Sequence, residues 1–278
     1  MKMNNTKAIE ANKIVHSSLA KIYNETEPHY NSESILRVEK ILIELCKNSG
    51  NDNLLDLGCG TGFIIDIAKK YFNYIKGVDV TKEMTDRIDQ TGKAKIEIEL
   101  CDTGKLKVEN SSFNVVTAYS FLDHLFELKP TFINAYKSLK PGGAFYADLM
   151  PNRAYWELLK RFSKYSVNQL LEKEINKVIE KPNEIEKEYG IKARDFINAE
   201  HQKHVKSGMD TNELQEILLD VGFNRVEFVY HWFIGEAQIL NKKSKNDFSK
   251  TKNINNYLTE ILPISSNYFK YVGFIAYK

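Results

Sequence analysis

Hydrophobic residues in the first fifty positions recur at the spacing of helices. Residues 7–20 and 33–48 each place apolar side chains on one face, which predicts two helices ahead of the first strand. Between them, residues 23–30 are rich in turn-forming residues and also carry Tyr23 and Tyr30. We expect this segment to form a loop that folds over a functional site.

From residue 54 onward, short apolar segments alternate with segments of helical period. The pattern predicts strands at 54–57, 74–80, 96–100, 113–120 and 144–150. Helices are expected at 63–72 and 130–139 and from Thr81, with a turn at 140–143. Beyond residue 207 the pattern resumes with a helix at 212–221 and strands at 223–233 and 268–277. Strands that alternate with helices imply a parallel, helix-covered α/β sheet with right-handed crossovers.

Two segments depart from this alternation. Residues 151–207 are helical in period throughout, and 57 residues exceed an ordinary connection, so we expect a helical lid or substrate wall after the fifth strand. A packing or oligomerisation element is the alternative. Residues 241–256 hold five lysines and few apolar residues, which predicts a mobile surface loop rather than a nucleic-acid contact.

These boundaries predict four regions. They are N-terminal helices covering the site at 1–52, a cofactor-binding core at 53–150, the helical insertion at 151–207, and the end of the core sheet at 208–278.

Composition narrows the class of protein. The hydrophobic content of 42% and charged content of 27% are ordinary for a soluble globule, and a net charge of +2 is too small to favour nucleic acid or an acidic membrane surface. With no helix-length apolar segment and no signal peptide in the sequence, we expect a cytoplasmic protein without a membrane or nucleic-acid partner. Cys46, Cys59 and Cys101 are odd in number and lack metal-type spacing, so we expect free thiols, with neither disulfides nor a metal.

The strongest local signal is Leu54–Gly62, which reads LLDLGCGTG and runs from a strand into a helix. Gly58 and Gly60 allow the backbone to turn sharply and to approach a ligand, and the free amides at the helix start favour a negatively charged group. Asp56 falls near the carboxyl end of its strand, where open α/β sheets bind ligands. This combination predicts a nucleotide-like cofactor site.

Three motifs resemble those of the class I S-adenosylmethionine-dependent methyltransferases: DLGCGTG at 56–62, GVD at 77–79 and LKPGG at 139–143. The resemblance covers residues 54–150 and resumes near Thr211. It implies a Rossmann-like seven-stranded sheet whose last strand runs antiparallel. Helices before the first strand and a helical insertion after the fifth are common in the branch of this family that methylates small molecules, so the chain resembles that branch.

The resemblance also implies S-adenosylmethionine as the cofactor. Asp79 can accept hydrogen bonds from both ribose hydroxyls, and Asp102 looks like the family's contact to the adenine amino group, with a solvated turn acid as the alternative. The cofactor-binding residues implied are Asp56, Gly58, Cys59, Gly60, Gly62, Asp79, Val80, Met84, Asp102, Thr103, Tyr119 and Ser120.

Methyl transfer is an in-line displacement that requires alignment and water exclusion, and a base helps when the acceptor is a hydroxyl or a protonated amine. His124 follows the fourth strand on the ligand edge, and the histidine side chain has a pKa suited to a base near neutral pH, so His124 is the candidate base. The alternative is that His124 caps or packs against the next helix. Each candidate for contact with the acceptor also has a packing or hydrogen-bonding alternative. These candidates are Tyr23, Tyr30, Asp148, His201 and His204.

The sequence therefore favours an enzyme that methylates an oxygen or nitrogen of a small molecule, and leaves the acceptor and oligomeric state open. A non-catalytic cofactor-binding or accessory protein of the same fold is the second hypothesis. An NAD(P)-dependent dehydrogenase is less favoured, because the third glycine of the dinucleotide pattern falls on Phe63.

Overall fold

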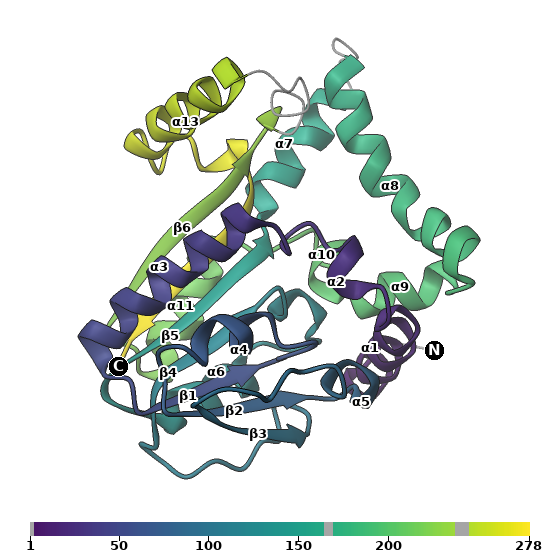
Figure 1. Ribbon diagram of the computed structural model, residues 1–278. Coiled ribbons are helices and arrows are strands. Elements are labelled where there is room, and N and C mark those ends of the chain that lie inside the picture. The colour runs from purple at the N-terminus through teal and green to yellow at the C-terminus, as the bar shows by residue number, and fades with distance from the viewer. Residues whose placement is uncertain (1–2, 164–168, 237–244) are drawn as a thin grey trace.

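A seven-stranded mixed sheet forms the centre of the protein, in the strand order β3-β2-β1-β4-β5-β7-β6 (Figure 1). The computed structural model describes residues 3–163, 169–236 and 245–278. The first five strands, β1 to β5, run parallel to one another, whereas β7 runs antiparallel to both β5 and β6. The strands are β1 Asn53–Leu57, β2 Tyr74–Asp79, β3 Lys95–Leu100, β4 Phe113–Tyr119, β5 Leu139–Pro151, β6 Arg225–Phe233 and β7 Phe269–Tyr277. The predicted Rossmann-like sheet with an antiparallel last strand is confirmed.

Helices cover both faces of the sheet and extend beyond it. Those of the sheet region are α3 Ser32–Ser49, α4 Phe63–Ala68, α5 Lys82–Thr85, α6 Lys129–Ser138 and α11 Thr211–Val221. The remaining helices are α1 Asn5–Leu19, α2 Tyr23–Thr26, α7 Arg153–Ser163, α8 Gln169–Tyr189, α9 Ala193–Ala199, α10 His201–His204 and α13 Lys245–Glu260, with short 3-10 turns η1 Leu122–His124 and η2 Ser266–Tyr268.

Two hydrophobic cores hold the three layers together. On one face, Leu42 of α3 and Ile64 of α4 pack against the sheet, and on the other, Phe132 of α6 and Leu218 of α11 do so. These four side chains are no more than 2% exposed. Full burial of such a side chain contributes about 1.5–3 kcal/mol, so the two cores fix the positions of the strand ends that carry the site.

The site lies at the point in the sheet where the connections from two adjacent strands, β1 and β4, lead in opposite directions. β1 pairs with β2 on one side and with β4 on the other, so the connections after β1 and β4 diverge to opposite faces. A crevice opens at the carboxyl ends of the strands at such a switch point, and this is where ligands bind in open α/β sheets. The glycine segment after β1 therefore begins at the ligand edge.

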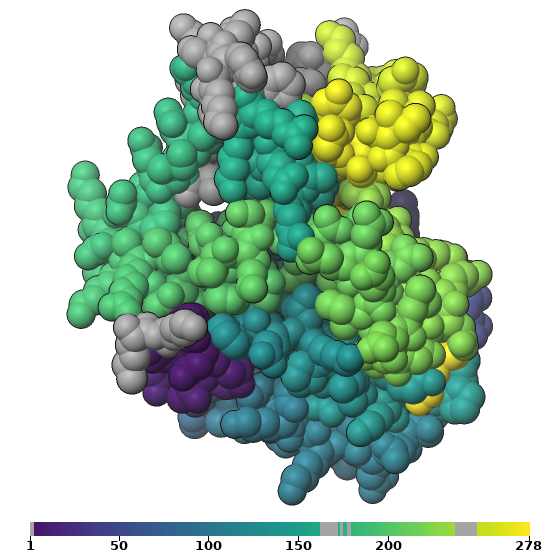
Figure 2. All heavy atoms as spheres, turned by 180° about the vertical axis from the view of Figure 1, so that it is seen from behind, coloured from purple at the N-terminus to yellow at the C-terminus, as the bar shows by residue number. Residues whose placement is uncertain are grey.

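The segment between β5 and α11 forms an extended arm of helices (Figure 1). Its far part returns to the N-terminus, because Ile191 and Phe196 pack against Val15 and Leu19 of α1. The view from behind shows the α8–α10 region and the N-terminal helix in contact on one side of the molecule (Figure 2). The insertion thus supports a helix that covers the sheet edge, and its division into a separate region remains a prediction.

The expected surface loop at 241–256 is wrong for its larger part. Residues 245–256 belong to helix α13, while residues 241–244 lie outside the described part of the chain. The less exposed positions of α13 include Thr251, Asn255 and Leu258, which have helical spacing, but two of the three are polar. Hydrophobic periodicity cannot detect such a face. Likewise, the predicted loop at 23–30 contains the short helix α2.

The described helices include none that is both long enough and apolar enough to cross a membrane.

Candidate cofactor site and active site

The glycine segment after β1 makes a tight turn into α4. The amides of Gly58 and Cys59 both donate to the carbonyl of Val78, 2.8 and 3.1 Å away, which fastens the turn to β2. Gly58 has a φ of +70°, a conformation that costs an L-residue about 1–2 kcal/mol. A Cβ on Gly58 would also lie 2.0 Å from the ring of Phe121. Only glycine therefore allows the turn and the chain after β4 to approach each other this closely.

Asp79 at the end of β2 connects the glycine turn to the neighbouring strand. Its Oδ2 accepts from the amide of Gly60 at 2.9 Å, and its Oδ1 accepts from the amide of Thr81 at 2.8 Å. Burial raises the pKa of the Asp79 carboxyl, although these amides act in the opposite direction. Each carboxylate oxygen retains a second lone pair, so Asp79 can accept from a diol while keeping both amides.

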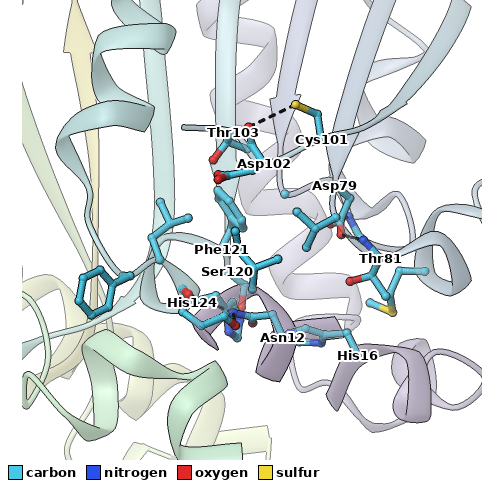
Figure 3. Close-up of a pocket in the computed structure, with 18 of the residues that line it drawn as sticks. Asn12, His16, Asp79, Thr81, Cys101, Asp102, Thr103, Ser120, Phe121 and His124 are labelled. Carbon is cyan, nitrogen blue, oxygen red and sulfur yellow. Dashed lines mark hydrogen bonds between the residues drawn. The ribbon is translucent and has the colours of Figure 1, made fainter. Parts of the chain in front are cut away.

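A cavity with about 680 Å³ of empty space, part of it open to solvent, lies in front of Asp79 (Figure 3). It is lined by the glycine turn, the ends of β2, β3 and β4, and one face of α1. Ten residues predicted from the sequence line it: Tyr23, Gly58, Gly60, Asp79, Val80, Met84, Asp102, Thr103, Ser120 and His124.

A second cavity adjoins the first, because Tyr23, Gly58, Gly60 and Ser120 line both. The predicted residues Tyr30, Asp56, Cys59 and Tyr119 line this second cavity but not the first. Gly62 lines neither of the two. Gly62 instead precedes the first turn of α4 with a φ of +94°.

Asp56 is the charged group at the base of the second cavity. Its Oδ1 accepts from the hydroxyl of Thr117 at 2.8 Å, and the residue is 2% exposed. Burial raises the pKa of Asp56 to about 7. A cationic group bound in this cavity would stabilise the carboxylate form, because opposite charges favour ionisation at close range.

Helix α1 supplies lining residues that the sequence did not single out. Asn5 Nδ2 donates to Asp102 Oδ2 at 3.2 Å, and Asn12 Nδ2 donates to the carbonyl of His124 at 3.1 Å. His16 packs edge-on against His124 with 4.8 Å between ring centroids, and both side chains point into the cavity region (Figure 3). Burial, followed by the proximity of His124, lowers the pKa of His16 to about 3. The sequence feature that could have identified these residues is the polar pair Asn12 and His16, which lie four residues apart and therefore share one face of the expected helix.

His124 lies at the end of η1 and is held by the insertion. Its Nδ1 is 3.0 Å from the carbonyl oxygen of Ala199, which can only accept, so this geometry assigns the proton to Nδ1. Nε2 then carries the lone pair and lies 3.8 Å from Asp123 Oδ1. An imidazole fixed in this tautomer, with Nε2 available, can accept a proton.

The tyrosines predicted to contact the acceptor lie in the expected region. Tyr23 is part of α2 and lines both cavities, while the hydroxyl of Tyr30 is 2.5 Å from Thr61 Oγ1 of the glycine turn. His29, between them, is edge-on to Phe63 with ring centroids 5.0 Å apart. These aromatic contacts fasten the 23–30 segment over the second cavity.

Asp148 lines neither cavity, since it is fully buried. It accepts from the hydroxyl of Tyr146 at 2.6 Å and from the amide of Leu149 at 2.7 Å, and His231 Nε2 lies 3.0 Å away. Burial raises its pKa, but His231 and Arg37 outweigh this effect and lower the pKa to about 2. The structure thus gives Asp148 the backbone-bonding role that was the alternative to acceptor contact.

His201 and His204 also line neither cavity, despite sharing α10. His204 Nε2 is 2.9 Å from Glu200, whereas His201 is 2% exposed and packs against Phe126. Across residues 3–163, 169–236 and 245–278, no group of three or more histidine, cysteine, aspartate or glutamate side chains could hold a metal ion.

The buried neutral histidines predict sensitivity to acid. Burial, with the charge of Arg37, lowers the pKa of His29 to about 4. Because the unfolded chain binds this proton from about pH 6.5 downward and the folded chain only near pH 4, the free energy of unfolding falls as the pH drops through this window. Between pH 7.5 and 5, we expect the free energy of unfolding to fall by about 2 kcal/mol less in His29→Phe than in the wild type, as measured by urea unfolding. An unchanged pH slope in this variant would contradict burial of a neutral His29.

Comparison with known proteins finds similarity in the part of the chain that holds the glycine turn and Asp79. Residues 55–147 match the family described as "Methyltransferase domain". The chain is 25% identical over 117 residues, 40% of its length, to phosphoethanolamine N-methyltransferase 2 of Caenorhabditis elegans, and covers 26% of that protein. It is 30% identical over 99 residues, 33% of its length, to arsenite methyltransferase of Halobacterium salinarum, and covers 25% of that protein. The chain thus spans about a quarter of the length of these curated relatives.

A solved S-adenosylmethionine-dependent methyltransferase from Archaeoglobus fulgidus has a similar fold, with a TM-score of 0.51 and 16% identity over 88% of this chain and 95% of that one. The matched domain begins in β1 and ends in β5, so it contains the glycine turn, Asp79 and the end of β4. This match decides against the dehydrogenase alternative. Residues 55–147 thus match a methyltransferase domain, and the seven-stranded fold is shared with a solved S-adenosylmethionine-dependent methyltransferase.

Proposed function

We propose that this chain transfers a methyl group from S-adenosylmethionine to a nitrogen or oxygen of a small-molecule acceptor. The observation that supports this most is the convergence on one cavity of Asp79, bonded to the glycine turn, and His124, whose Nε2 is available as a base.

The residues present fit the donor. Asp79 would accept from the ribose hydroxyls, and Asp102 with Thr103 would face the adenine end of the first cavity. Asp56 in the second cavity would pair with the amino group of the methionine portion, which accounts for a buried carboxyl without a cationic partner among the described residues. When bound, the donor supplies a methyl group already activated by a positively charged sulfur.

The chain itself then has to orient the acceptor, exclude water and hold a proton. His124 Nε2 would take the proton that the acceptor loses, while the carbonyl of Ala199 keeps the ring in the required orientation. Tyr23 and Tyr30 of the covering segment, together with α1, would shield part of the two cavities from solvent. Cytoplasmic location remains a prediction.

A small acceptor agrees with the similarity to relatives named for phosphoethanolamine and arsenite, both of which are small molecules.

Replacement of His124 with glutamine tests this function. We expect turnover to fall by about 10²-fold or more, the usual contribution of a general base, while the affinity for S-adenosylhomocysteine stays nearly unchanged in calorimetry. Turnover would be measured with labelled donor and a small-molecule cell extract. His204→Gln is the matched control, because His204 lines neither cavity. Full activity of the His124 variant would exclude the base role, and tight donor binding without any labelled product from the wild-type chain would favour the accessory protein.

A further inference from the structure

We propose that the acceptor is a protonated amine and that the carboxylate of Asp123 binds it. This inference rests on the proposed methyltransferase function and narrows its acceptor from nitrogen or oxygen to a basic nitrogen.

Asp123 is a largely buried carboxylate, one oxygen of which accepts no hydrogen bond from the described residues. It lies in η1 directly before His124 and is only 7% exposed. Its Oδ1 is buried and, as far as the structure describes the chain, accepts no hydrogen bond. The nearest basic atom recorded for it is Nε2 of His124, at 3.8 Å. Burial of a charged oxygen without a partner is unfavourable unless a cation compensates it, so this carboxylate points to a ligand that supplies the charge.

Among the described residues, no lysine or arginine forms a direct ion pair with Asp123. Lys203 is the basic side chain that interacts with it electrostatically, but Lys203 Nζ is bound to Glu200 at 2.6 Å. Glu27, a second carboxylate near this cluster, has its recorded ion-pair contact with His29 at 3.9 Å, and burial keeps His29 neutral near pH 7. Glu200 is thus paired with Lys203, and Glu27 interacts with both Lys203 and Lys181, so a cation bound at Asp123 would supply the direct partner that this carboxylate lacks.

This unpaired charge lies beside the place where methyl transfer is proposed. Tyr23 lines both cavities and interacts electrostatically with both Asp79 and Asp123. Asp123 itself lines neither cavity, but its Oδ1 lies 3.8 Å from Nε2 of His124, which lines the first cavity. An ammonium bound to Asp123 would thus lie near the base and near the junction of the two cavities.

The chemistry also favours an amine over an alcohol. An ammonium provides both the missing charge and N–H donors, whereas a hydroxyl leaves the carboxylate uncompensated. The ammonium gives one proton to Nε2 of His124, and the freed nitrogen lone pair forms the bond to the methyl carbon. The carbon–sulfur bond breaks with its electron pair moving to sulfur, so the methylated product is again a cation and the donor product is neutral. Asp123 stabilises the cation before and after the transfer.

The test uses ethylammonium as the probe, because it is the fragment that primary alkylamines share. The full chain, saturated with S-adenosylhomocysteine, is melted in about 100 mM ethylammonium chloride, in the same concentration of sodium chloride, and in sodium chloride with ethanol. We expect ethylammonium to raise the melting temperature above both references. This gain should disappear in Asp123→Asn and persist in Glu127→Gln, an exposed carboxylate in the same connection.

A second measurement separates ligand binding from a merely structural role. Removal of the uncompensated charge should raise the melting temperature of the free Asp123→Asn protein by about 2 °C or more, whereas loss of a structural contact would lower it. Equal melting in ethylammonium and sodium chloride, or a gain that survives in Asp123→Asn, overturns the inference.

A failure of the amine inference can be distinguished from a failure of the proposed methyltransferase function. Labelled products from a cell extract that are O-methyl compounds would overturn the amine inference and leave the methyltransferase function intact. Tight donor binding with no labelled product at all would overturn both.

Discussion

Replacement of Gly58 with alanine is expected to abolish measurable donor binding, with a loss of at least about 100-fold in affinity for S-adenosylhomocysteine. The new Cβ would meet the ring of Phe121 at 2.0 Å, and the φ of +70° adds a backbone strain of about 1–2 kcal/mol. Phe121 lines the donor cavity, so its displacement would change the shape of the site directly. Calorimetry with S-adenosylhomocysteine and thermal unfolding measure the two effects separately.

Gly142→Ala is the matched control for this prediction. Gly142 has a similar φ of +78°, but nothing lies within 4 Å of the position that its Cβ would occupy. This variant should lose stability by the strain alone, about 1–2 kcal/mol, and should bind the donor product normally. If both variants bind equally well, the close approach of the glycine turn to Phe121 has no role in the site.

Replacement of Asp79 with alanine is expected to weaken donor binding by at least about 1 kcal/mol, and by 10- to 100-fold if the backbone around it relaxes. The carboxylate accepts from the amides of Gly60 and Thr81, and hydrogen bonds to a charged group contribute about 1.5–3 kcal/mol each. The variant therefore loses the ribose acceptor and also an anchor of the glycine turn.

Asp79→Asn distinguishes the two contributions, because its amide oxygen can still accept from one backbone amide. We expect its affinity to lie between those of wild type and Asp79→Ala. Asp86→Ala, at an exposed acid paired with Lys82 at 2.5 Å, should bind normally. Calorimetric affinity for S-adenosylhomocysteine that is unchanged in Asp79→Ala would exclude the ribose assignment.

The fold was predictable because local patterns and the global topology agree. The strands of the sheet carry apolar residues either consecutively or in alternation with polar ones, and the glycine turn and the acid that ends β2 occur at fixed distances from strand ends. Helix α13 was not predictable in this way, because Thr251 and Asn255 are polar residues on its less exposed side. A period in hydrophobicity cannot be read from a face that is mostly polar.

The candidate site was predicted only where it follows from strand ends. Gly58, Gly60, Asp79, Asp102 and His124 line the first cavity because parallel strands bring their carboxyl ends to one edge. Asp148 also belongs to that edge, but Arg37 of α3 and His231 of β6 surround it. Those partners are more than eighty residues away in the sequence, so their pairing depends on how the layers pack.

The sequence by itself was sufficient to predict the donor site, since a turn, an acid and a base at fixed positions after successive strands are local features with local causes. Only the tertiary structure decided which groups are left uncompensated. It placed α1 over the first cavity, bound Lys203 to Glu200, and left Oδ1 of Asp123, beside His124, without a hydrogen-bond donor among the described residues. Burial and electrostatic balance depend on contacts between distant segments, and therefore the chemistry of the acceptor becomes visible only in the folded chain.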